Sequence, residues 1–395
     1  MSPKQQLLEI RRRIIPLYEL QETILNNDIF PEMEKAGIVL HHYNNLNEED
    51  RALLDEEFRE NILPVLTPLT LGPANPFPRL INRNLNIAFV LRDNTKSIPQ
   101  QKIGFLQLPA VLPRFIRLKN RPKYHFIMIE QVIKKYAEVL YPGLEIVATN
   151  TFRVTRDADI EVAEDEADDL LSEIAEQVKQ RRWGRAPVRL EVSAHMPEYL
   201  VNLLMNALDL EPTDVYIVNR PLNLPDFSHL TKLDIQELKD TPFATRAISQ
   251  FKAGGPGVFS AIKQHDLLVH HPFDSFTNGT LRFINEAADD ADVVAIKITL
   301  YRTGNNSSVV AALKRAAEKG KYVTAFVELK ARFDEENNII WAKELESTGV
   351  HVVYGVPGLK THCKIAMVVR KESNRLKTYL HLSTGNYNQV TARQY

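Results

Sequence analysis

Alternating apolar and helix-like segments between residues 292 and 354 constrain the fold of this chain more than any other feature. The apolar segments are nearly continuous runs, as in strands buried on both faces of a sheet. The helix-like segments each end at a glycine, Gly320 and Gly349. The predicted elements, alternating strand and helix, are 292–301, 309–319, 322–329, 335–348 and 350–354. This βαβαβ order predicts a parallel sheet with right-handed crossovers, followed by two further strands at 363–369 and 378–382.

The rest of the chain predicts a different architecture. Residues 1–33 are expected to be mostly helical, with Pro16 breaking or kinking the helix. Short strand-like runs and helices between residues 85 and 208 indicate an α+β region, in which 163–182 is the clearest helix. The length of 395 residues suggests two to three domains. We place the linker before the second domain at residues 226–257.

Composition excludes several classes of protein. A formal net charge of -1 gives no overall attraction to a polyanion, so only a local basic patch could bind one. The single cysteine, Cys363, rules out an internal disulfide and fits a reducing cytosol. The N-terminus lacks the apolar core of a signal peptide. No run approaches the roughly 20 apolar residues that span a bilayer.

Basic residues follow the predicted strands at a regular spacing. Arg302 follows the first strand, Arg332 comes 30 residues later, and His362 another 30 residues on. Because ligands bind beyond the carboxyl ends of such strands, these side chains are expected to meet at one edge of the sheet. Guanidinium groups suit phosphate oxygens, and a neutral histidine can attack phosphorus. Lys364 adds positive charge beside His362. On position alone, a solvated arginine or a structural histidine remains the alternative.

His362 and Lys364 also fit the H-x-K core of the phospholipase D superfamily, whose histidine forms a phospho-enzyme. That superfamily usually has an aspartate five positions after the lysine. Here the position is Val369, which argues against ordinary phosphodiesterase chemistry. The segment 383–386 resembles the superfamily's segment of small residues and asparagine, which lies close to the histidine.

Longer motifs then resemble one family, the class 1 polyphosphate kinases. In the C-terminal part they are AIKITLYR (295–302), VELKARFDEE (327–336), PGLKTHCK (357–364), STGNYN (383–388) and TARQY (391–395). Upstream they are PVLTPL (64–69) with PFP (76–78), and DLLVHHPF (266–273). The resemblance covers nearly the whole chain. It implies a multidomain protein: residues 1–33 from an N-terminal helical domain, 34–248 as an α+β head domain, and 249–395 as an incomplete phospholipase D-like α/β domain.

The resemblance also implies a reaction and its residues. The family transfers the terminal phosphate of ATP reversibly to inorganic polyphosphate through a phosphohistidine, and His362 matches that histidine. Arg302 and Arg332 match positions associated with Mg²⁺. Since arginine has no lone pair for a metal, we expect both to hold phosphate oxygens that Mg²⁺ bridges. Tyr395 matches a nucleotide-binding position. Lys364 and Asn386 are further candidates for phosphate contact.

Family members have four domains, so this chain is expected to be truncated at both ends of a longer protein, which we call the parent enzyme. With one half of the active site, the chain alone is expected to be inactive. Two alternatives stay open: a non-catalytic fragment that binds nucleotide or polyphosphate, and a phospholipase D-type phosphodiesterase. The resemblance further implies ATP or ADP and polyphosphate as partners rather than nucleic acid, a homo-oligomer, and a cytoplasmic location with peripheral association at the inner face of the membrane.

Overall fold

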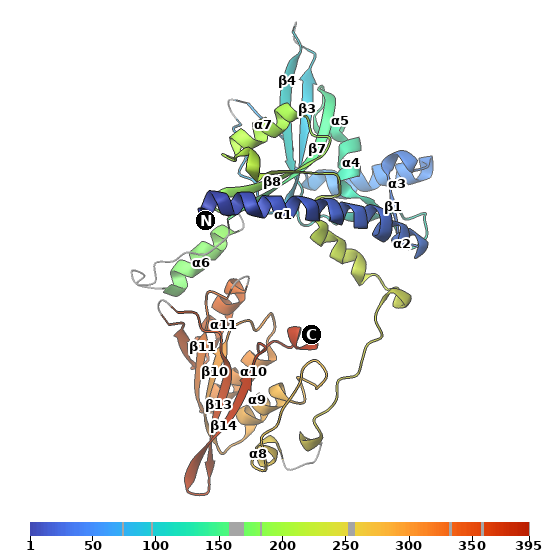
Figure 1. The fold of residues 1–395 in the computed structure, drawn as a ribbon. Coiled ribbons are helices and arrows are strands. Elements are labelled where there is room, and N and C mark those ends of the chain that lie inside the picture. Colours follow the sequence, from blue (N-terminus) through green and yellow to red (C-terminus); the bar gives the residue numbers. More distant parts are fainter. Residues whose placement is uncertain are drawn as a thin grey trace. The chain divides into compact units, whose positions relative to one another are not determined.

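The computed structural model describes residues 1–72, 75–95, 98–157, 170–181, 184–251, 257–331, 334–356 and 359–394. The chain forms two compact units (Figure 1). The first unit comprises Met1–Ala158 and Arg181–Asp234, and the second comprises Asp159–Gln180 and Ile235–Tyr395. The predicted multidomain class, with helices, an α+β part and a phospholipase D-like α/β part, is confirmed.

The first unit is built on a six-stranded sheet in the order β2-β4-β3-β7-β8-β9 and a three-stranded sheet in the order β1-β6-β5. Its strands are β1 (Val39–His41), β2 (Leu69–Thr70), β3 (Leu85–Asp93), β4 (Gln100–Gln107), β5 (Phe115–Arg117), β6 (His125–Met128), β7 (Glu145–Arg156), β8 (Pro187–Ser193) and β9 (Val215–Val218). Its helices are α1 (Pro3–Ile24), α2 (Phe30–Lys35), α3 (Glu48–Glu57), α4 (Ile129–Lys135), α5 (Ala137–Leu140) and α7 (Glu198–Ala207). Two neighbouring pairs are parallel, β8 with β9 and β1 with β6.

The central strand β3 explains why the large sheet has a core on each face. Successive side chains of a strand point to opposite faces. Ile87, Phe89 and Leu91 belong to one buried cluster, whereas Ala88 and Val90 belong to another. The middle of the strand, residues 87–91, is therefore apolar at every position.

Of the two outcomes expected at Pro16, a break or a kink in the first helix, the break does not occur. Helix α1 continues through Pro16 to Ile24, and a π-helical turn (Leu25–Ile29) joins it to α2. Proline removes one hydrogen bond to the carbonyl group four residues earlier. Because Pro16 and Arg12 lie on the exposed side of the helix, water can satisfy that carbonyl group. The helix runs alongside β8 (Figure 1), where the Tyr18 hydroxyl lies 3.2 Å from the Glu191 carboxylate.

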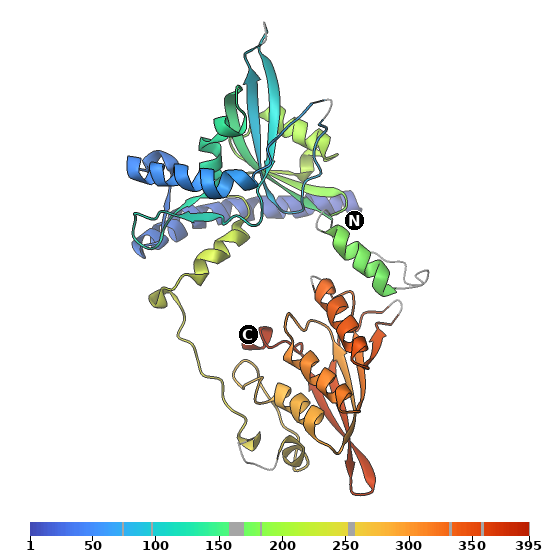
Figure 2. The same cartoon turned by 180° about the vertical axis from the view of Figure 1, so that it is seen from behind.

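The second unit contains the βαβαβ arrangement that the sequence predicts. Its five strands lie in the order β12-β11-β10-β13-β14, with β10, β11 and β12 parallel and β13 and β14 antiparallel to their neighbours. The strands are β10 (Val293–Leu300), β11 (Tyr322–Val327), β12 (His351–Tyr354), β13 (Lys364–Glu372) and β14 (Arg375–Ser383). Figure 2 shows β13 and β14 as a long hairpin.

Five helices complete the second unit: α6 (Leu170–Arg181), α8 (Val258–Ile262), α9 (Thr280–Asp289), α10 (Ser308–Glu318) and α11 (Glu335–Ser347). Helix α6 is the described part of the helix predicted at 163–182, and the acidic start of that prediction lies outside the described residues. Ile174 of α6 is fully buried in the same core as Ile296 and Ile298 of β10. The linker predicted at 226–257 carries short 3₁₀ turns, including Leu224–Lys232 and Gln236–Leu238.

Candidate active site around His362

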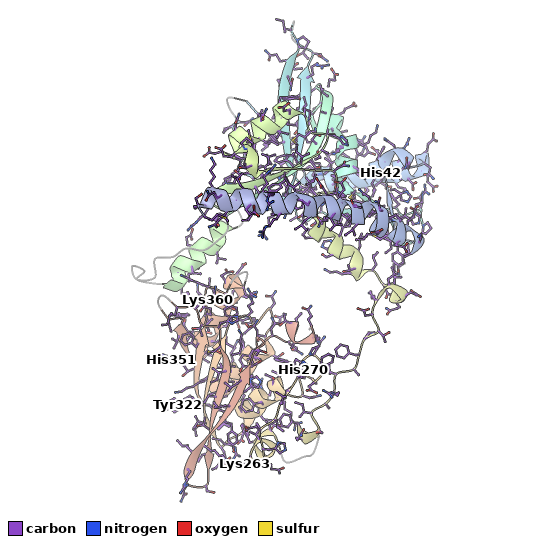
Figure 3. All side chains as sticks on the ribbon, viewed as in Figure 1. His42, Lys263, His270, Tyr322, His351 and Lys360 are labelled. Carbon is purple, nitrogen blue, oxygen red and sulfur yellow. The ribbon has the colours of Figure 1, made fainter. Side chains whose placement is uncertain are left out.

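The carboxyl ends of β10 and β11 define one end of the sheet in the second unit. Figure 3 shows Lys360, on the loop after β12, at this end, whereas Tyr322 begins β11 at the other. Residues 301–307 follow β10 here, and residues 359–363 lead into β13. Parallel strands bring the segments that follow them to one edge. The loop before β13 returns to the same edge because β13 pairs with β10.

Tyr301 is the side chain around which the predicted basic residues gather. The His362 ring meets the Tyr301 ring edge to face, with centroids 4.7 Å apart and planes at 84°. The Arg302 guanidinium carbon lies 5.4 Å from the centre of the Tyr301 ring, and the Lys364 Nζ lies 5.2 Å from it. Tyr301 is 8% exposed and His362 is exposed. The arrangement therefore holds an accessible imidazole and two cations around one buried aromatic ring.

Lys364 is buried although it carries a charge. Its side chain is 5% exposed, and Nζ donates a hydrogen bond of 2.5 Å to the His362 carbonyl oxygen. Burial lowers the pKa of Lys364, the neighbouring Cys363 opposes that shift, and the charge of Arg302 adds to it. A lysine in this position keeps donors available for an anion at the sheet edge. Cys363 is exposed.

Thr299 fixes the backbone on the C-terminal side of His362. Its hydroxyl donates to the Cys363 carbonyl oxygen at 2.8 Å and accepts from the Ile365 N–H at 3.0 Å. These contacts join β10 to the start of β13 where the two strands pair. One hydroxyl thus holds the peptide groups on both sides of Lys364, which limits how far the His362 backbone can move.

Glu328 fixes the backbone on the N-terminal side of His362. This residue follows β11 and is 4% exposed. Its carboxylate accepts from the Thr361 N–H at 2.7 Å and from the Lys330 N–H at 3.1 Å. Asn338 of α11, which is 1% exposed, donates to the carbonyl oxygens of Glu328 at 2.8 Å and Tyr301 at 2.6 Å. The histidine loop, the end of β11 and the Tyr301 backbone are therefore connected through buried polar groups.

Asn386 lies three residues beyond β14. Lys364 pairs with Ser383 in the β13–β14 ladder, so the chain leaves β14 beside the start of β13. The Asn386 Oδ1 atom is buried and has no hydrogen-bond partner among the described residues. A buried amide oxygen without a donor is costly, so a ligand that donates a hydrogen bond would satisfy it.

A chain of hydrogen bonds positions the segment that carries Asn386. Thr280 Oγ1 lies 3.1 Å from the Nε2 atoms of both His271 and His381, and His381 Nδ1 lies 2.9 Å from the Tyr387 hydroxyl. His271 Nδ1 lies 2.7 Å from the carbonyl oxygen of Asp274 and must donate to it. When the His271 ring is neutral, Thr280 donates to His271 and accepts from His381, which accepts from Tyr387. Burial and the neighbouring His271 lower the pKa of His381 to about 4, so the ring is neutral at neutral pH.

The charged groups of the site could be predicted from the sequence, but the residues that hold them in place could not. Thr299, Tyr301 and Glu328 lie inside motifs that the sequence singled out, yet motif membership does not reveal which peptide group each one holds. Arg332 and Tyr395, two of the predicted site residues, lie outside the described residues. The roles of His362, Arg302, Lys364 and Asn386 stay predictions.

The residues around His362 do not form a metal site by themselves. Among the described ranges, no three His, Cys, Asp or Glu side chains are placed to hold one ion. Arg302 offers only donors, and the Glu328 carboxylate already accepts two backbone N–H groups. A divalent cation would need further oxygen ligands here, such as those of a bound phosphate chain.

Two family models match this chain, and together they cover most of it. The model for the polyphosphate kinase middle domain matches residues 49–230, and the model for polyphosphate kinase C-terminal domain 1 matches residues 257–395. The second match contains the whole arrangement around Tyr301. The chain belongs to the polyphosphate kinase family.

Individual relatives agree with the family models. Polyphosphate kinase 1 of Chlorobaculum tepidum is 44% identical over 402 residues, and the polyphosphate kinase of Bacillus cereus is 43% identical over 401 residues. Each alignment covers 100% of this chain and 57% of the relative. The crystal structure of polyphosphate kinase from Porphyromonas gingivalis matches with a TM-score of 0.80 and 29% identity, covering 99% of this chain and 57% of that one. The chain thus spans a little over half the length of these relatives.

Proposed function

We propose that this chain carries the phosphoryl-accepting part of a polyphosphate kinase, with His362 as the nucleophile. The observation that supports the proposal is the exposed His362 imidazole beside Arg302 and Lys364 on the Tyr301 ring. The transferred phosphoryl group carries negative charge throughout the reaction, so fixed cations beside the nucleophile stabilise its transition state.

In the proposed reaction, a ring nitrogen of His362 attacks the γ-phosphorus of ATP. An N–P bond forms while the bond from that phosphorus to the β–γ bridging oxygen breaks, and the bridging oxygen leaves with its electron pair as part of ADP. A terminal oxygen of polyphosphate then attacks the phosphohistidine and releases the histidine. Each half-reaction exchanges one bond to phosphorus for another, so the same site can run in either direction.

The supporting residues would act by holding and orienting groups. Arg302 offers a planar fork of donors for two phosphate oxygens, and Lys364 adds a point charge beside the same Tyr301 ring. Thr299 and Glu328 hold the backbone of the His362 loop, so that the nucleophile needs little rearrangement. Arg332 and Tyr395 are proposed to contact phosphate and nucleotide. Mg²⁺ would arrive bound to the phosphates, whose charge it neutralises.

The parent enzyme, rather than the 395-residue chain alone, is proposed to make polyphosphate. This chain covers only 57% of its relatives' length, and polymer synthesis by the purified chain with ATP and Mg²⁺ would contradict that part of the proposal. Homo-oligomerisation and peripheral membrane association stay predictions. No helix in the described part of the chain is both long and apolar enough to cross a bilayer.

The two alternative functions differ from the kinase in what they do with ATP. A phosphodiesterase would hydrolyse a phosphodiester without nucleotide, but the phospholipase D aspartate is replaced by Val369, whose backbone pairs with Ala295 inside the sheet. A non-catalytic module would bind ATP without forming a covalent adduct.

The test is to label the parent enzyme with γ-phosphate from ATP and then expose the product to acid and to alkali. A phosphohistidine is labile in acid and stable in alkali. His362→Ala is expected to abolish the label. His351→Ala, which removes an exposed histidine at the amino end of β12 (Figure 3), is the matched control and should keep it. Labelling that survives His362→Ala would refute the assignment.

A further inference from the structure

A cavity of about 750 Å³ lies in the first unit, and none of its lining residues belongs to the His362 site. It forms where the carboxyl ends of two parallel strand pairs face each other. Ser193 ends β8 and Val218 ends β9, while Met128 ends β6 and His42 follows β1. Ligands commonly bind beyond the carboxyl ends of parallel strands, and the cavity has the volume of a small-molecule site.

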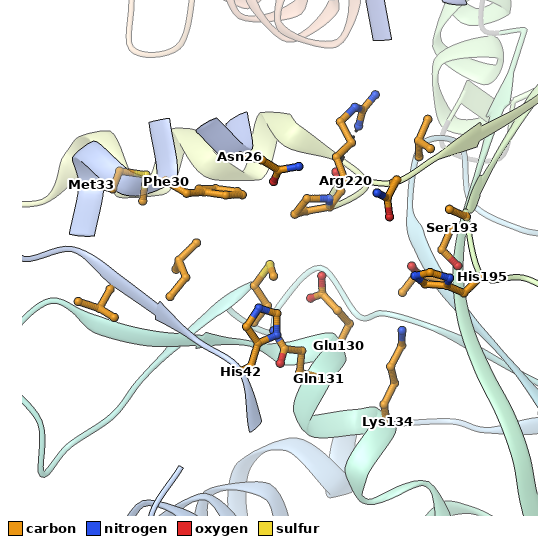
Figure 4. A pocket seen from close by; sticks show the side chains of 18 of the residues that line it. Asn26, Phe30, Met33, His42, Glu130, Gln131, Lys134, Ser193, His195 and Arg220 are labelled. Atoms are coloured by element: carbon orange, nitrogen blue, oxygen red, sulfur yellow. Dashed lines mark hydrogen bonds between the residues drawn. The ribbon is translucent and has the colours of Figure 1, made fainter. Parts of the chain in front are cut away.

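The cavity has one apolar side and one polar side (Figure 4). Phe30 and Met33 lie at the apolar side, and Val39 and Met128 are further apolar residues of the lining. At the other side Lys134 extends toward His195 and Ser193. A cavity with one apolar and one polar side suits a molecule with an apolar body and a polar end.

Lys134 is the group in this cavity whose chemistry the fold does not explain. It lies on α4, it is half-buried, and its Nζ makes no hydrogen bond or ion pair with the described residues. Burial lowers the pKa of Lys134, and the charge of Glu130 only partly opposes this. A desolvated amine without an acceptor costs free energy, which an anion in the cavity would recover.

The acidic residues of the cavity restrict the charge of such an anion. The Glu130 carboxylate accepts two hydrogen bonds from Arg114, at 2.8 and 2.5 Å, and Arg114 also pairs with Asp226. Glu34 lines the cavity as an exposed side chain. The Arg220 guanidinium is turned away from the cavity, 4.9 Å from the Tyr18 ring. Among the described residues that line the cavity, Lys134 is the one cation without a hydrogen bond or ion pair, and two acids also line it, which disfavours a long polyanion and favours a ligand with a single oxyanion.

We propose that this cavity binds a small organic oxyanion, a molecule with an apolar or aromatic body and one terminal phosphate or carboxylate, and that Lys134 pairs with its anionic group. The apolar body lies against Phe30 and Met33. The ligand is distinct from polyphosphate, and the site is separate from the proposed phosphoryl transfer at His362, so neither proposal depends on the other.

The first experiment locates the site by covalent labelling. Pyridoxal 5′-phosphate has an aromatic ring, a phosphate group and an aldehyde that condenses with an unprotonated amine, losing water to form an imine, which borohydride reduces to a stable secondary amine. Peptide mapping of the 395-residue chain is expected to find Lys134 labelled severalfold faster than Lys135, its exposed neighbour on α4. AMP should protect Lys134 if a phosphate is preferred, and indole-3-acetate if a carboxylate is preferred, whereas adenosine should not. Equal labelling of the two lysines, or no protection by either anion, would overturn the proposal.

The second experiment separates ligand binding from a structural role. Lys134→Met replaces the amine with an apolar side chain of similar length, and Lys135→Met is the matched control. We expect Lys134→Met to raise the urea midpoint of the first unit and to remove the stabilisation of that unit by the protecting anion, because only binding to the folded state gives such stabilisation. A lower midpoint, or unchanged stabilisation by the anion, would assign Lys134 to structure and contradict the proposal.

Discussion

Glu328→Gln tests whether the Glu328 carboxylate holds the His362 loop through its hydrogen bond with the Thr361 N–H. In the native chain, the two oxygens of Glu328 accept the N–H groups of Thr361 and Lys330. Glutamine keeps one acceptor oxygen and replaces the other with an NH₂ donor, so one of the two buried N–H groups faces another donor. The substitution changes charge and hydrogen bonding while keeping the volume of the side chain.

The size of the effect follows from these contacts. A hydrogen bond to a charged acceptor contributes about 1.5–3 kcal/mol, and a buried donor left without a partner costs a similar amount. With Glu328 4% exposed, water cannot easily replace the lost bond. We expect the free energy of unfolding of the second unit to fall by about 1.5–3 kcal/mol. If phosphoryl transfer requires the native loop geometry, restoring it costs up to the same 1.5–3 kcal/mol, so the rate of His362 labelling in the parent enzyme should fall by up to about ten- to a hundredfold, at 1.4 kcal/mol per factor of ten.

Urea unfolding of the 395-residue chain measures the first quantity, and labelling from ATP in the parent enzyme measures the second. Glu346→Gln is the matched control, since Glu346 is exposed on α11 and its substitution should change stability by less than about 0.5 kcal/mol. If Glu328→Gln behaves like this control in both assays, then the carboxylate does not hold the loop.

Three further predictions address other contacts. Thr299→Val keeps the shape of the side chain but removes two hydrogen bonds, so the second unit should lose about 1–3 kcal/mol in urea unfolding and His362 should label more slowly; Thr324→Val on β11 is the control. His381 has a folded pKa of about 4 against an ordinary value of 6.5, so the unfolded chain binds more protons between these values. Stability of the second unit should therefore fall as pH drops from 6.5 to 4, by on the order of 3 kcal/mol, and a pH series of urea midpoints that His381→Gln fails to flatten would contradict this. Arg114→Met leaves the Glu130 carboxylate buried without its partner, and should lower the stability of the first unit by about 3–5 kcal/mol; a loss no larger than that of an exposed arginine would show that the pair is not essential.

The alternation of strands and helices in the second unit could be predicted from the sequence, because the apolar residues repeat with a regular period. The continuous apolar runs of β10 and β11 and the helices between them leave few alternatives to a parallel sheet. Strand spacing then brings Arg302 and His362 to one edge of it, although they are 60 residues apart. Both inferences rest on repeating geometry, which local sequence carries.

The hydrogen bonds that hold the His362 loop join residues far apart in the sequence, so local sequence patterns do not reveal them. Thr299 reaches a peptide group 64 residues away, and Glu328 reaches one 33 residues away. A threonine in a strand and a glutamate at a strand end have ordinary sequence roles, so nothing in the pattern indicates these bonds. Pro16 shows the same limitation: its propensity predicts a break or a kink, but the helix continues through it, because an exposed helix face allows water to replace the missing bond.

Mapping the phosphate on the parent enzyme shows whether His362 accepts the phosphoryl group. The enzyme would be incubated briefly with ATP and Mg²⁺, digested without acid, and sequenced by mass spectrometry with a fragmentation method that preserves the N–P bond. We expect the phosphate on His362 itself, in the native enzyme and in Cys363→Ser alike. A phosphate on another residue of this chain, or polymer synthesis by an enzyme whose His362 is never modified, would contradict it.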